Sequence, residues 1–291
     1  MVEFSRGSQI QDSLLSPVRR AKLILLSRKM AAGYTARTAT ISTQSETAFP
    51  SLSKNRCAAN SMRKPRISIL IPTSGNNPLL KDCLASISKL IYPKRRIQTI
   101  VVTNDDLAKA GKTFSFAAAV NQAASKATGD LLLVTNDDVV FTPDSLSGWI
   151  KASRRYPNTI LGAKILDTAT KRPAASGYTL NRWTGIAKPV YTANRPVACD
   201  WIAGCALLVS RKIWTKLGGF DERFAPGYFE DSDFCARASK SGIGSLIIPG
   251  VTLFHKQTTS FNRNKSAKYE YWYRNKFLFL RLHASPLELA T

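Results

Sequence analysis

Three short apolar segments, each followed by a helical pattern, begin about 30 residues apart in this chain. The apolar segments are residues 67–72, 97–103 and 130–135. Apolar side chains then recur at helical spacing in residues 78–90, 115–127 and 143–155. An interval of about 30 residues is the length of a strand–helix–strand unit with two parallel strands. The sequence therefore predicts an α/β fold with a mostly parallel, Rossmann-like central sheet flanked by helices.

The second half of the chain has a more mixed pattern. Polar and aromatic residues alternate at 177–191, which favours a hairpin, and the apolar run GSLIIP predicts a strand at 244–249. Helical patterns occupy residues 211–217, 229–241 and 265–283. We therefore expect one domain over residues 66–291, with a mixed second half and an aromatic, basic helix at its end.

Residues 1–65 differ from the rest of the chain in composition. The first 66 residues hold 12 basic and three acidic side chains and show little apolar periodicity. Such a segment buries too little apolar surface to fold by itself, so we expect a basic, mostly disordered extension. An organelle transit peptide has the same composition and is the alternative.

The net charge of +23 favours an anionic partner, such as nucleic acid, an anionic membrane surface or a phosphorylated small molecule. No apolar stretch approaches the roughly 18 residues of a membrane-spanning helix. Five scattered cysteines without a C-x-x-C pair argue against a disulfide framework and against structural zinc. We therefore expect a cytoplasmic protein.

Carboxylates are few after residue 66, and they are clustered. Nine of these 16 side chains fall in four tight groups, at 105–106, 137–138, 221–222 and 230–233. Adjacent carboxylates repel one another and are costly to bury unpaired. Their clustering therefore indicates a bound cation or a proton-transfer function.

Two polar groups, at 104–106 and 136–138, come directly after predicted strands. Ligands of open parallel sheets bind beyond the carboxyl ends of the strands, so both groups and the loop at 72–75 should face one crevice. Oxygen ligands there suit Mg²⁺ or Mn²⁺, held by one or two carboxylates together with substrate phosphates. The alternative is ordinary turn chemistry, because Asn and Asp are common in turns.

Five segments, in this order along the chain, resemble family 2 of the inverting glycosyltransferases that use nucleotide sugars, and within it the bacterial rhamnosyltransferase-like members. They are ISILIPTSG, FSFAAAVNQA, DLLLVTNDDVVF, WIAGCALLV and GGFDERFAPGYFEDSDFCARA. The resemblance covers roughly residues 66–282, and the order and spacing of the segments carry it. It implies a GT-A-type fold.

The resemblance implies a metal site after the third predicted strand. Asn136-x-Asp138 takes the place of the family's D-x-D motif, so Asp138 would bind the Mn²⁺ or Mg²⁺ ion that bridges the donor diphosphate. Asp137 would assist at the ribose or at the metal. His255 lies where related folds complete the metal site, and a structural histidine is the alternative.

The resemblance also implies where the rest of the donor binds. The residues it places around the nucleoside or elsewhere on the donor are Pro72, Thr73, Asn104 and Asn121. The family usually carries an aspartate at the place of Thr103, so Asp105 or Asp106 is expected to substitute for it.

The segment YFEDSDF matches the family's acidic motif on the acceptor side. Asp231 would be the general base for the incoming hydroxyl, with Glu230 orienting it or binding the acceptor. The alternative is that both carboxylates simply favour a helix N-terminus. Trp201 and Gly204 would form a wall of the acceptor site, or else a core tryptophan beside a close-packed glycine.

The final helix allows two interpretations. Its aromatic and basic residues suit packing on the domain, or peripheral contact with an anionic membrane on its inner face. Asp233 is expected to pair with Arg237, four residues later. His283 is assigned no role.

These features favour a metal-dependent inverting glycosyltransferase that moves a sugar from a nucleoside diphosphate donor to a hydroxyl of a glycan or lipid-linked acceptor. The first rival is a basic nucleic-acid-binding protein, but the basic residues are dispersed and no RNA-binding motif is recognisable, so no nucleic-acid partner is expected. The second is a nucleotidyltransferase of the same fold class, whose Gly-rich phosphate loop usually needs a Lys or Arg that residues 72–78 lack.

Overall fold

The computed structural model describes residues 64–75, 77–181, 186–191, 194–256 and 265–284. The basic extension predicted at 1–65 lies outside these residues, apart from its last two. Within the described ranges, no helix has the length and apolar character needed to cross a bilayer.

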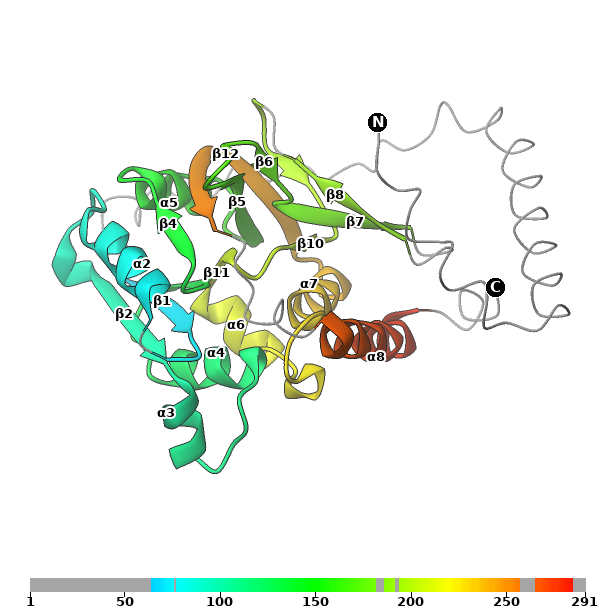
Figure 1. Ribbon diagram of the computed structural model, residues 1–291. Helices are drawn as coiled ribbons and strands as arrows, with labels where there is room; N and C mark the ends of the chain where they lie inside the picture. Colours follow the sequence, from blue (N-terminus) through cyan, green and yellow to red (C-terminus); the bar gives the residue numbers. More distant parts are fainter. Residues whose placement is uncertain (1–63, 76, 182–185, 192–193, 257–264, 285–291) are drawn as a thin grey trace, which may run out of the picture. The chain divides into compact units, whose positions relative to one another are not determined.

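The main path of the central sheet runs β2-β1-β3-β11-β5-β12-β4 (Figure 1). Strands β1, β2, β3, β5 and β12 run in one direction, and β11 and β4 run in the other. The prediction of a mostly parallel sheet is therefore confirmed. The path strands are β1 Ile67–Pro72, β2 Ile97–Val102, β3 Leu131–Thr135, β4 Val139–Phe141, β5 Thr159–Asp167, β11 Ala206–Ser210 and β12 Gly244–His255, with β6 Pro173–Ala174 and β9 Val197–Ala198 paired beside them.

Strand β11 lies between β3 and β5 and is antiparallel to both. Its register pairs Ala206 with Thr135, the last residue of β3. Because an antiparallel strand begins where its neighbour ends, the turn before β11 lies at the carboxyl edge of β3. That turn contains Gly204 and Cys205.

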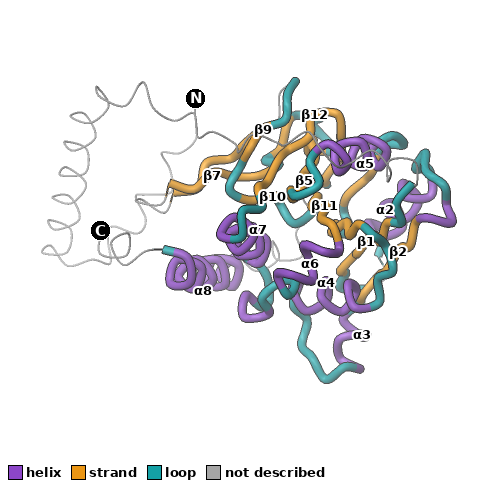
Figure 2. The backbone as a smooth tube through the Cα atoms, turned by 180° about the vertical axis from the view of Figure 1, so that it is seen from behind, coloured by secondary structure: helices purple, strands orange, loops and turns teal. Residues whose placement is uncertain are grey.

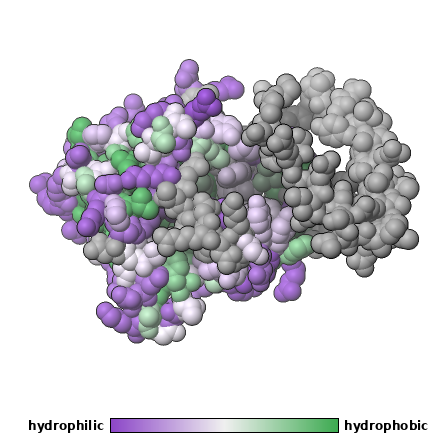
Figure 3. Space-filling model, viewed as in Figure 1, coloured by the Kyte–Doolittle hydropathy of each residue, from purple (hydrophilic) through white to green (hydrophobic). Residues whose placement is uncertain are grey.

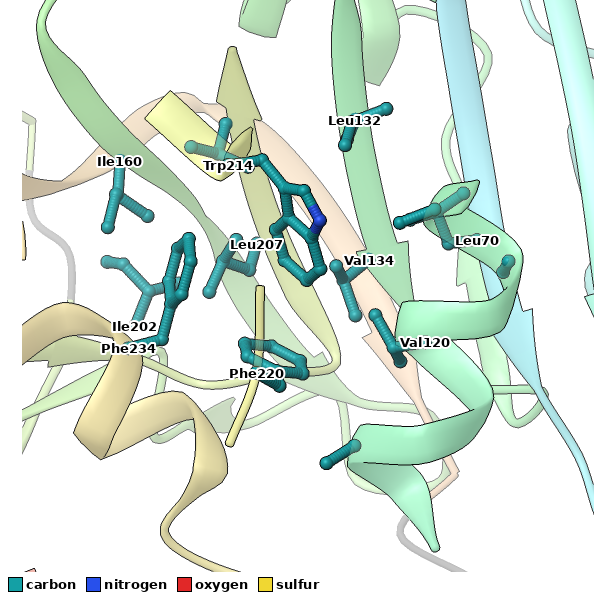
Figure 4. Close-up of a cluster of buried hydrophobic side chains, with 14 of the residues drawn as sticks. Leu70, Val120, Leu132, Val134, Ile160, Ile202, Leu207, Trp214, Phe220 and Phe234 are labelled. Carbon is teal, nitrogen blue, oxygen red and sulfur yellow. The ribbon is translucent and has the colours of Figure 1, made fainter. Parts of the chain in front are cut away.

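Helices cover both faces of the sheet, because side chains of each strand alternate between them. Leu132 and Val134 of β3 belong to the buried cluster that includes Trp214 and Phe234, whereas Leu133 belongs to the cluster on the other face. Figure 4 shows the first cluster between the sheet and its helices. The apolar residues visible on the described surface in Figure 3 are scattered in small areas. The helices are α2 Pro78–Ser88, α3 Asn104–Lys109, α4 Phe116–Ser125, α5 Ser145–Arg155, α6 Arg211–Leu217, α7 Glu230–Lys240 and α8 Lys265–His283, with 3₁₀ turns at Lys94–Arg96 and Glu222–Phe224.

A second, three-stranded sheet has the order β10-β7-β8. Strands β7 (Gly177–Asn181) and β8 (Ile186–Val190) form the predicted hairpin, and β10 (Trp201–Ile202) pairs with β7. Gly177 allows the close approach of β10, since a Cβ atom there would lie 2.6 Å from the Trp201 carbonyl oxygen.

Strand β12 and helix α3 differ from the sequence-based expectation, and strands β4 and β5 were not predicted. Strand β12 continues past residue 249 to His255, because a register shift between Ile248 and Thr252 accommodates the Pro-Gly step without ending the strand. Residues 104–109, for which no element was predicted, form helix α3. The Thr103 side chain caps this helix together with Asp106, which is a signal present in the sequence.

Candidate active site at the carboxyl edge of the sheet

Thr73 joins the carboxyl ends of three parallel strands. Its backbone N–H donates to the Val102 carbonyl at the end of β2 at 3.0 Å. Its buried hydroxyl donates to Asp137 Oδ2 after β3 at 2.5 Å, and the Asn77 amide donates to the same oxygen at 3.1 Å. Asp137 therefore fastens the loop after β1, which begins at Thr73 directly after Pro72, to the loop after β3.

The end of β2 presents two polar side chains to solvent. Asn104 and Asp105 are exposed on the first turn of α3. The Asp106 carboxylate instead accepts hydrogen bonds from the Thr103 N–H at 2.9 Å and the Thr103 hydroxyl at 2.7 Å, which hold the pKa of Asp106 below its usual value. Of the two candidates to replace the family's usual aspartate, only Asp105 is therefore uncommitted to the helix cap.

Both the nitrogen and the oxygen of the Asn121 side-chain amide form hydrogen bonds within the fold. Its Nδ2 donates to the Phe220 carbonyl at 2.8 Å and to Glu222 Oε1 at 3.2 Å, and its Oδ1 accepts from the Phe220 N–H at 2.9 Å. The side chain thus fixes the segment after α6 on α4.

Asp138, immediately before β4, and His255, at the end of β12, form a close pair. Asp138 is 5% exposed, and its Oδ1 lies 2.9 Å from His255 Nε2. The register of β4 and β12 causes this approach, because it pairs Val139 with His255. Neither atom has a hydrogen-bond partner with suitable geometry among the described residues, and the same is true of the buried Asn136 Oδ1.

This pair has the donor atoms that a divalent cation requires. No group of three His, Cys, Asp or Glu side chains that could hold a metal ion occurs in the described part of the chain. Magnesium and manganese sites commonly use one or two protein ligands and complete their shell with water and substrate phosphates. An orphaned carboxylate oxygen facing an orphaned imidazole nitrogen fits such a partial site.

Asp231 lies at the start of α7 and is held by two backbone N–H groups. Gly204 donates to its Oδ2 at 2.9 Å, and Ser232 donates to its Oδ1 at 2.7 Å. Burial raises the pKa of Asp231 above the usual range, and these hydrogen bonds offset part of that increase. Glu230 beside it is 7% exposed, and burial followed by the charge of Asp231 raises its pKa well above the usual value.

Both acidic residues line a cavity of about 580 Å³ between the β7–β8 hairpin, α7 and α8. Its walls are mainly apolar and aromatic. Trp201 lies in one wall, but its ring stacks on Tyr178 with centroids 5.3 Å apart, so its role includes packing. The other described lining residues include Leu180, Ala203, Tyr228, Phe229, Trp272, Lys276, Phe279 and Leu280.

Cys205 links the two acidic regions in space. The Thr135 hydroxyl, at the end of β3, donates to the Cys205 carbonyl at 3.0 Å. Burial raises the pKa of the Cys205 thiol, and the charges of Asp138 and Asp231 raise it further. The structure therefore brings Asp138 and Asp231 to the same edge of the sheet, one from the β3 side and the other from α7.

Two residues near this edge were not identified from the sequence. His283 was assigned no role, yet its Nε2 lies 2.7 Å from Oδ1 of the buried Asp233, which also pairs with Arg237 as predicted. Asn275 is fully buried and donates to carbonyls of the loop before α7. The i,i+4 spacing within one helix predicted the pairing of Asp233 with Arg237. No local sequence pattern indicates that residues of α8 contact α7.

Comparison with known proteins identifies the family. Residues 88–275 match the model of the family described as glycosyltransferase like family 2. The chain belongs to this family.

Members with curated functions are similar over part of their length. The N-acetylglucosaminyl-diphospho-decaprenol L-rhamnosyltransferase of Mycobacterium tuberculosis is 29% identical over 171 residues, which are 52% of this chain and 55% of that protein. Rhamnosyltransferase WbbL of Escherichia coli K12 is 30% identical over 151 residues, 47% of this chain and 56% of that protein. The chain thus spans about half the length of the curated relatives it matches.

Solved structures confirm the GT-A-type fold. GalNAc-T7, crystallised with UDP, GalNAc and Mn²⁺, superposes with a TM-score of 0.55 at 16% identity, over 66% of this chain and 43% of that one. Staphylococcus aureus TarS superposes with a TM-score of 0.50 at 13% identity, over 67% of this chain and 37% of that one. At these identities the similarity is one of fold.

Replacing Thr73 by valine should destabilise this family 2 domain. The variant keeps the shape of the side chain but removes the hydroxyl that donates to Asp137, at a cost of about 1–3 kcal/mol in the free energy of unfolding. Urea denaturation would measure the change. Thr73→Ser, which retains the hydroxyl, is the matched control, and equal stability of the two variants would contradict this role of Thr73.

Proposed function

We propose that the protein is an inverting glycosyltransferase that moves a sugar from a nucleoside diphosphate donor to a hydroxyl of a glycan or lipid-linked acceptor, using Mn²⁺ or Mg²⁺. The proposal rests on one arrangement of side chains, found in a chain that belongs to family 2. A buried carboxylate, Asp231, borders a large cavity, and the Asp138–His255 pair lies at the same sheet edge near Cys205. The two chemical requirements of the reaction, a base and a site for the leaving diphosphate, thus have candidates close together.

Asp138 and His255 would hold the cation. When bound, a divalent cation neutralises the charge that develops on the leaving diphosphate. The nucleoside would lie at the ends of β1 and β2, where Pro72 and Thr73 shape the loop and the exposed Asn104 and Asp105 offer polar groups. Asp137 supports this region through its hydrogen bond from Thr73.

Asp231 would accept the proton of the attacking hydroxyl. A carboxylate is a better base when its pKa is raised toward neutrality, and burial does this for Asp231. The Gly204 N–H fixes the Oδ2 atom, so the carboxylate keeps one orientation at the cavity. Glu230, buried next to it with no hydrogen-bond partner for Oε2 among the described residues, is a candidate to bind the acceptor.

The cavity suits an acceptor with both apolar and anionic parts. Its walls are mainly apolar, and Lys276 is the single cation among its described lining residues, with Nζ 5.4 Å from the centre of the Trp272 ring. The mycobacterial relative is named for an acceptor that contains a diphosphate and a polyprenol. We therefore propose a lipid-linked saccharide as acceptor, with its phosphate near Lys276.

Such an acceptor implies contact with a membrane surface. On α8, Tyr269, Tyr273 and Phe277 are each more than half exposed and recur every four residues, so they form a stripe along one side of the helix. Exposed aromatic residues beside basic ones suit an anionic interface. The proposal is a cytoplasmic enzyme that acts at the inner face of the membrane.

Asp231→Asn should abolish transfer while the protein still folds and binds donor. The amide keeps the shape of the side chain but cannot accept the proton, so kcat should fall at least about 100-fold. Asp221→Asn, which alters a surface pair with Arg223, is the matched control and should stay near wild type. Turnover of Asp231→Asn at the wild-type rate would remove the base assignment.

Asp138→Ala and His255→Ala should each weaken the Mn²⁺-dependent binding of donor. A panel of nucleoside diphosphate sugars would be screened with and without Mn²⁺ by thermal stabilisation, followed by calorimetric titration of the best donor. Wild type should show stabilisation that requires Mn²⁺, and both variants should lose it. Unchanged titrations would place the metal elsewhere.

Lys276→Ala should raise KM for a diphosphate-linked acceptor about tenfold or more, because a charge-assisted contact worth about 1.5–3 kcal/mol is lost. The value of kcat should change little, since the contact is made equally in the ground and transition states. Steady-state kinetics with a short-chain polyprenyl diphosphate saccharide would measure both. Lys151→Ala on α5 is the control, and an unchanged KM for Lys276→Ala would contradict the phosphate contact.

A further inference from the structure

Helix α8 places a buried amide against the turn that precedes α7. Asn275 is 0% exposed, and its Nδ2 donates to the carbonyls of Phe224 at 2.8 Å, Gly227 at 2.8 Å and Tyr228 at 3.1 Å. Its Oδ1 accepts from the Arg274 guanidinium at 3.0 and 3.1 Å. The whole hydrogen-bonding capacity of this side chain is thus used to hold the loop and itself in place.

The turn has a backbone conformation that needs support. Tyr228 and Phe229 have φ angles of 76° and 74°, in the left-handed region that residues with a Cβ atom rarely adopt. Two such residues in succession direct the Gly227 and Tyr228 carbonyls toward Asn275. Helix α7 begins immediately afterwards, so this turn sets the direction in which Glu230 and Asp231 leave the loop.

Helices α7 and α8 lie side by side in both views (Figure 1 and Figure 2), and further contacts fix their register. The Phe229 ring packs on Trp272 and Phe279 of α8, with centroids 5.6 and 5.7 Å apart. Eight residues after Asn275, about 12 Å along the helix axis, His283 contacts Asp233 of α7 at 2.7 Å. These contacts hold α8 in register with α7, so Asn275 binds the turn from a fixed position.

We propose that Asn275 is a positioning residue that keeps Asp231 buried and aimed at the cavity by tethering the left-handed turn at residues 228–229. This inference rests on the proposed function, in which Asp231 is the base. Asn275 does not line the cavity and does not contact Asp231 in the described structure, so it acts through the backbone. Without the tether the turn relaxes toward ordinary φ angles and Asp231 becomes hydrated.

Hydration of Asp231 has a consequence for the pH dependence of transfer. Burial is the main cause of its raised pKa, so exposure lowers that pKa toward the ordinary aspartate value. Transfer requires the ionised carboxylate, so the acidic limb of the kcat profile moves to lower pH. The titratable groups facing this site from the elements around it are Glu230 and Cys235 on α7, Tyr228 in the turn before it, Tyr178 on β7, Cys205 before β11 and Lys276 on α8.

Asn275→Ala tests the tether by kinetics and by amide hydrogen exchange. We expect kcat to fall about 100-fold, the scale of a small misplacement of a reacting group, with donor KM unchanged. The acidic limb should shift to lower pH, and amides 227–232 should exchange faster. Asn158→Ala, which removes a side-chain contact of 3.5 Å to the Gly242 carbonyl beyond the other end of α7, is the matched control and should alter none of these.

A double variant gives a second test of the tether, which applies if Asn275→Ala folds poorly. Tyr228→Gly removes the cost of one of the two left-handed φ angles, so adding Asn275→Ala should lower kcat and shift the acidic limb less in the Tyr228→Gly background than in the wild type. A loss of activity on adding Asn275→Ala to Tyr228→Gly that equals or exceeds the loss in the wild type would overturn the proposal. So would a lower kcat of Asn275→Ala with an unmoved acidic limb and unchanged exchange.

The hydrogen-exchange arm separates this inference from the proposed function. If wild type transfers no sugar, or if Asp231→Asn retains full turnover, the proposed function fails. Faster exchange confined to amides 227–232 would still support the tether in that case. Unchanged exchange in a folded Asn275→Ala protein would overturn the tether, whatever the activity of the wild type.

Discussion

The antiparallel insertion of β11 between β3 and β5 is the constraint on which the candidate site depends. It places the turn at Gly204 and Cys205 beside the carboxyl end of β3. The Gly204 N–H then binds Asp231 of α7, so a helix from the second half of the chain reaches the edge formed by the first. A fully parallel sheet would have put that turn at the opposite edge, away from Asp138.

The few carboxylates of this basic chain divide by what surrounds them. Several are committed to local structure: Asp106 caps α3, Asp137 ties two loops, and Asp233 pairs with Arg237 and His283. Others are buried with an oxygen that accepts no hydrogen bond of suitable geometry from the described residues. These are Asp138 and Glu230. Burying a carboxylate oxygen without a hydrogen bond costs free energy, and a bound substrate or cation would offset that cost.

The candidate acceptor region depends on contacts between elements far apart in the sequence. Its cavity has walls from the hairpin, α7 and α8, and α8 is held to α7 through Asn275 and His283. The aromatic residues of α8 divide between these purposes. Trp272 and Phe279 pack inward on Phe229, whereas Tyr269, Tyr273 and Phe277 stay exposed. Packing on the domain therefore accounts for one face of the helix, and peripheral membrane contact stays a proposal for the other.

The sequence by itself determined many of the elements, although not β4 and β5, and the edge at which the acidic groups gather. Alternation and helical spacing are local properties, so they located β1, β3, α6 and α8 within two residues, and strand ends identified the groups at 104–106 and 136–138. Only the tertiary structure decided which of these side chains are free to act. Burial, strand register and the packing of α8 on α7 arise from residues tens to hundreds of positions apart. That is why the pairing of His283 with Asp233 and the hydrogen bonds of Asn275 have no signature in any local stretch of the chain, and why the approach of His255 to Asp138 was expected only from the family resemblance.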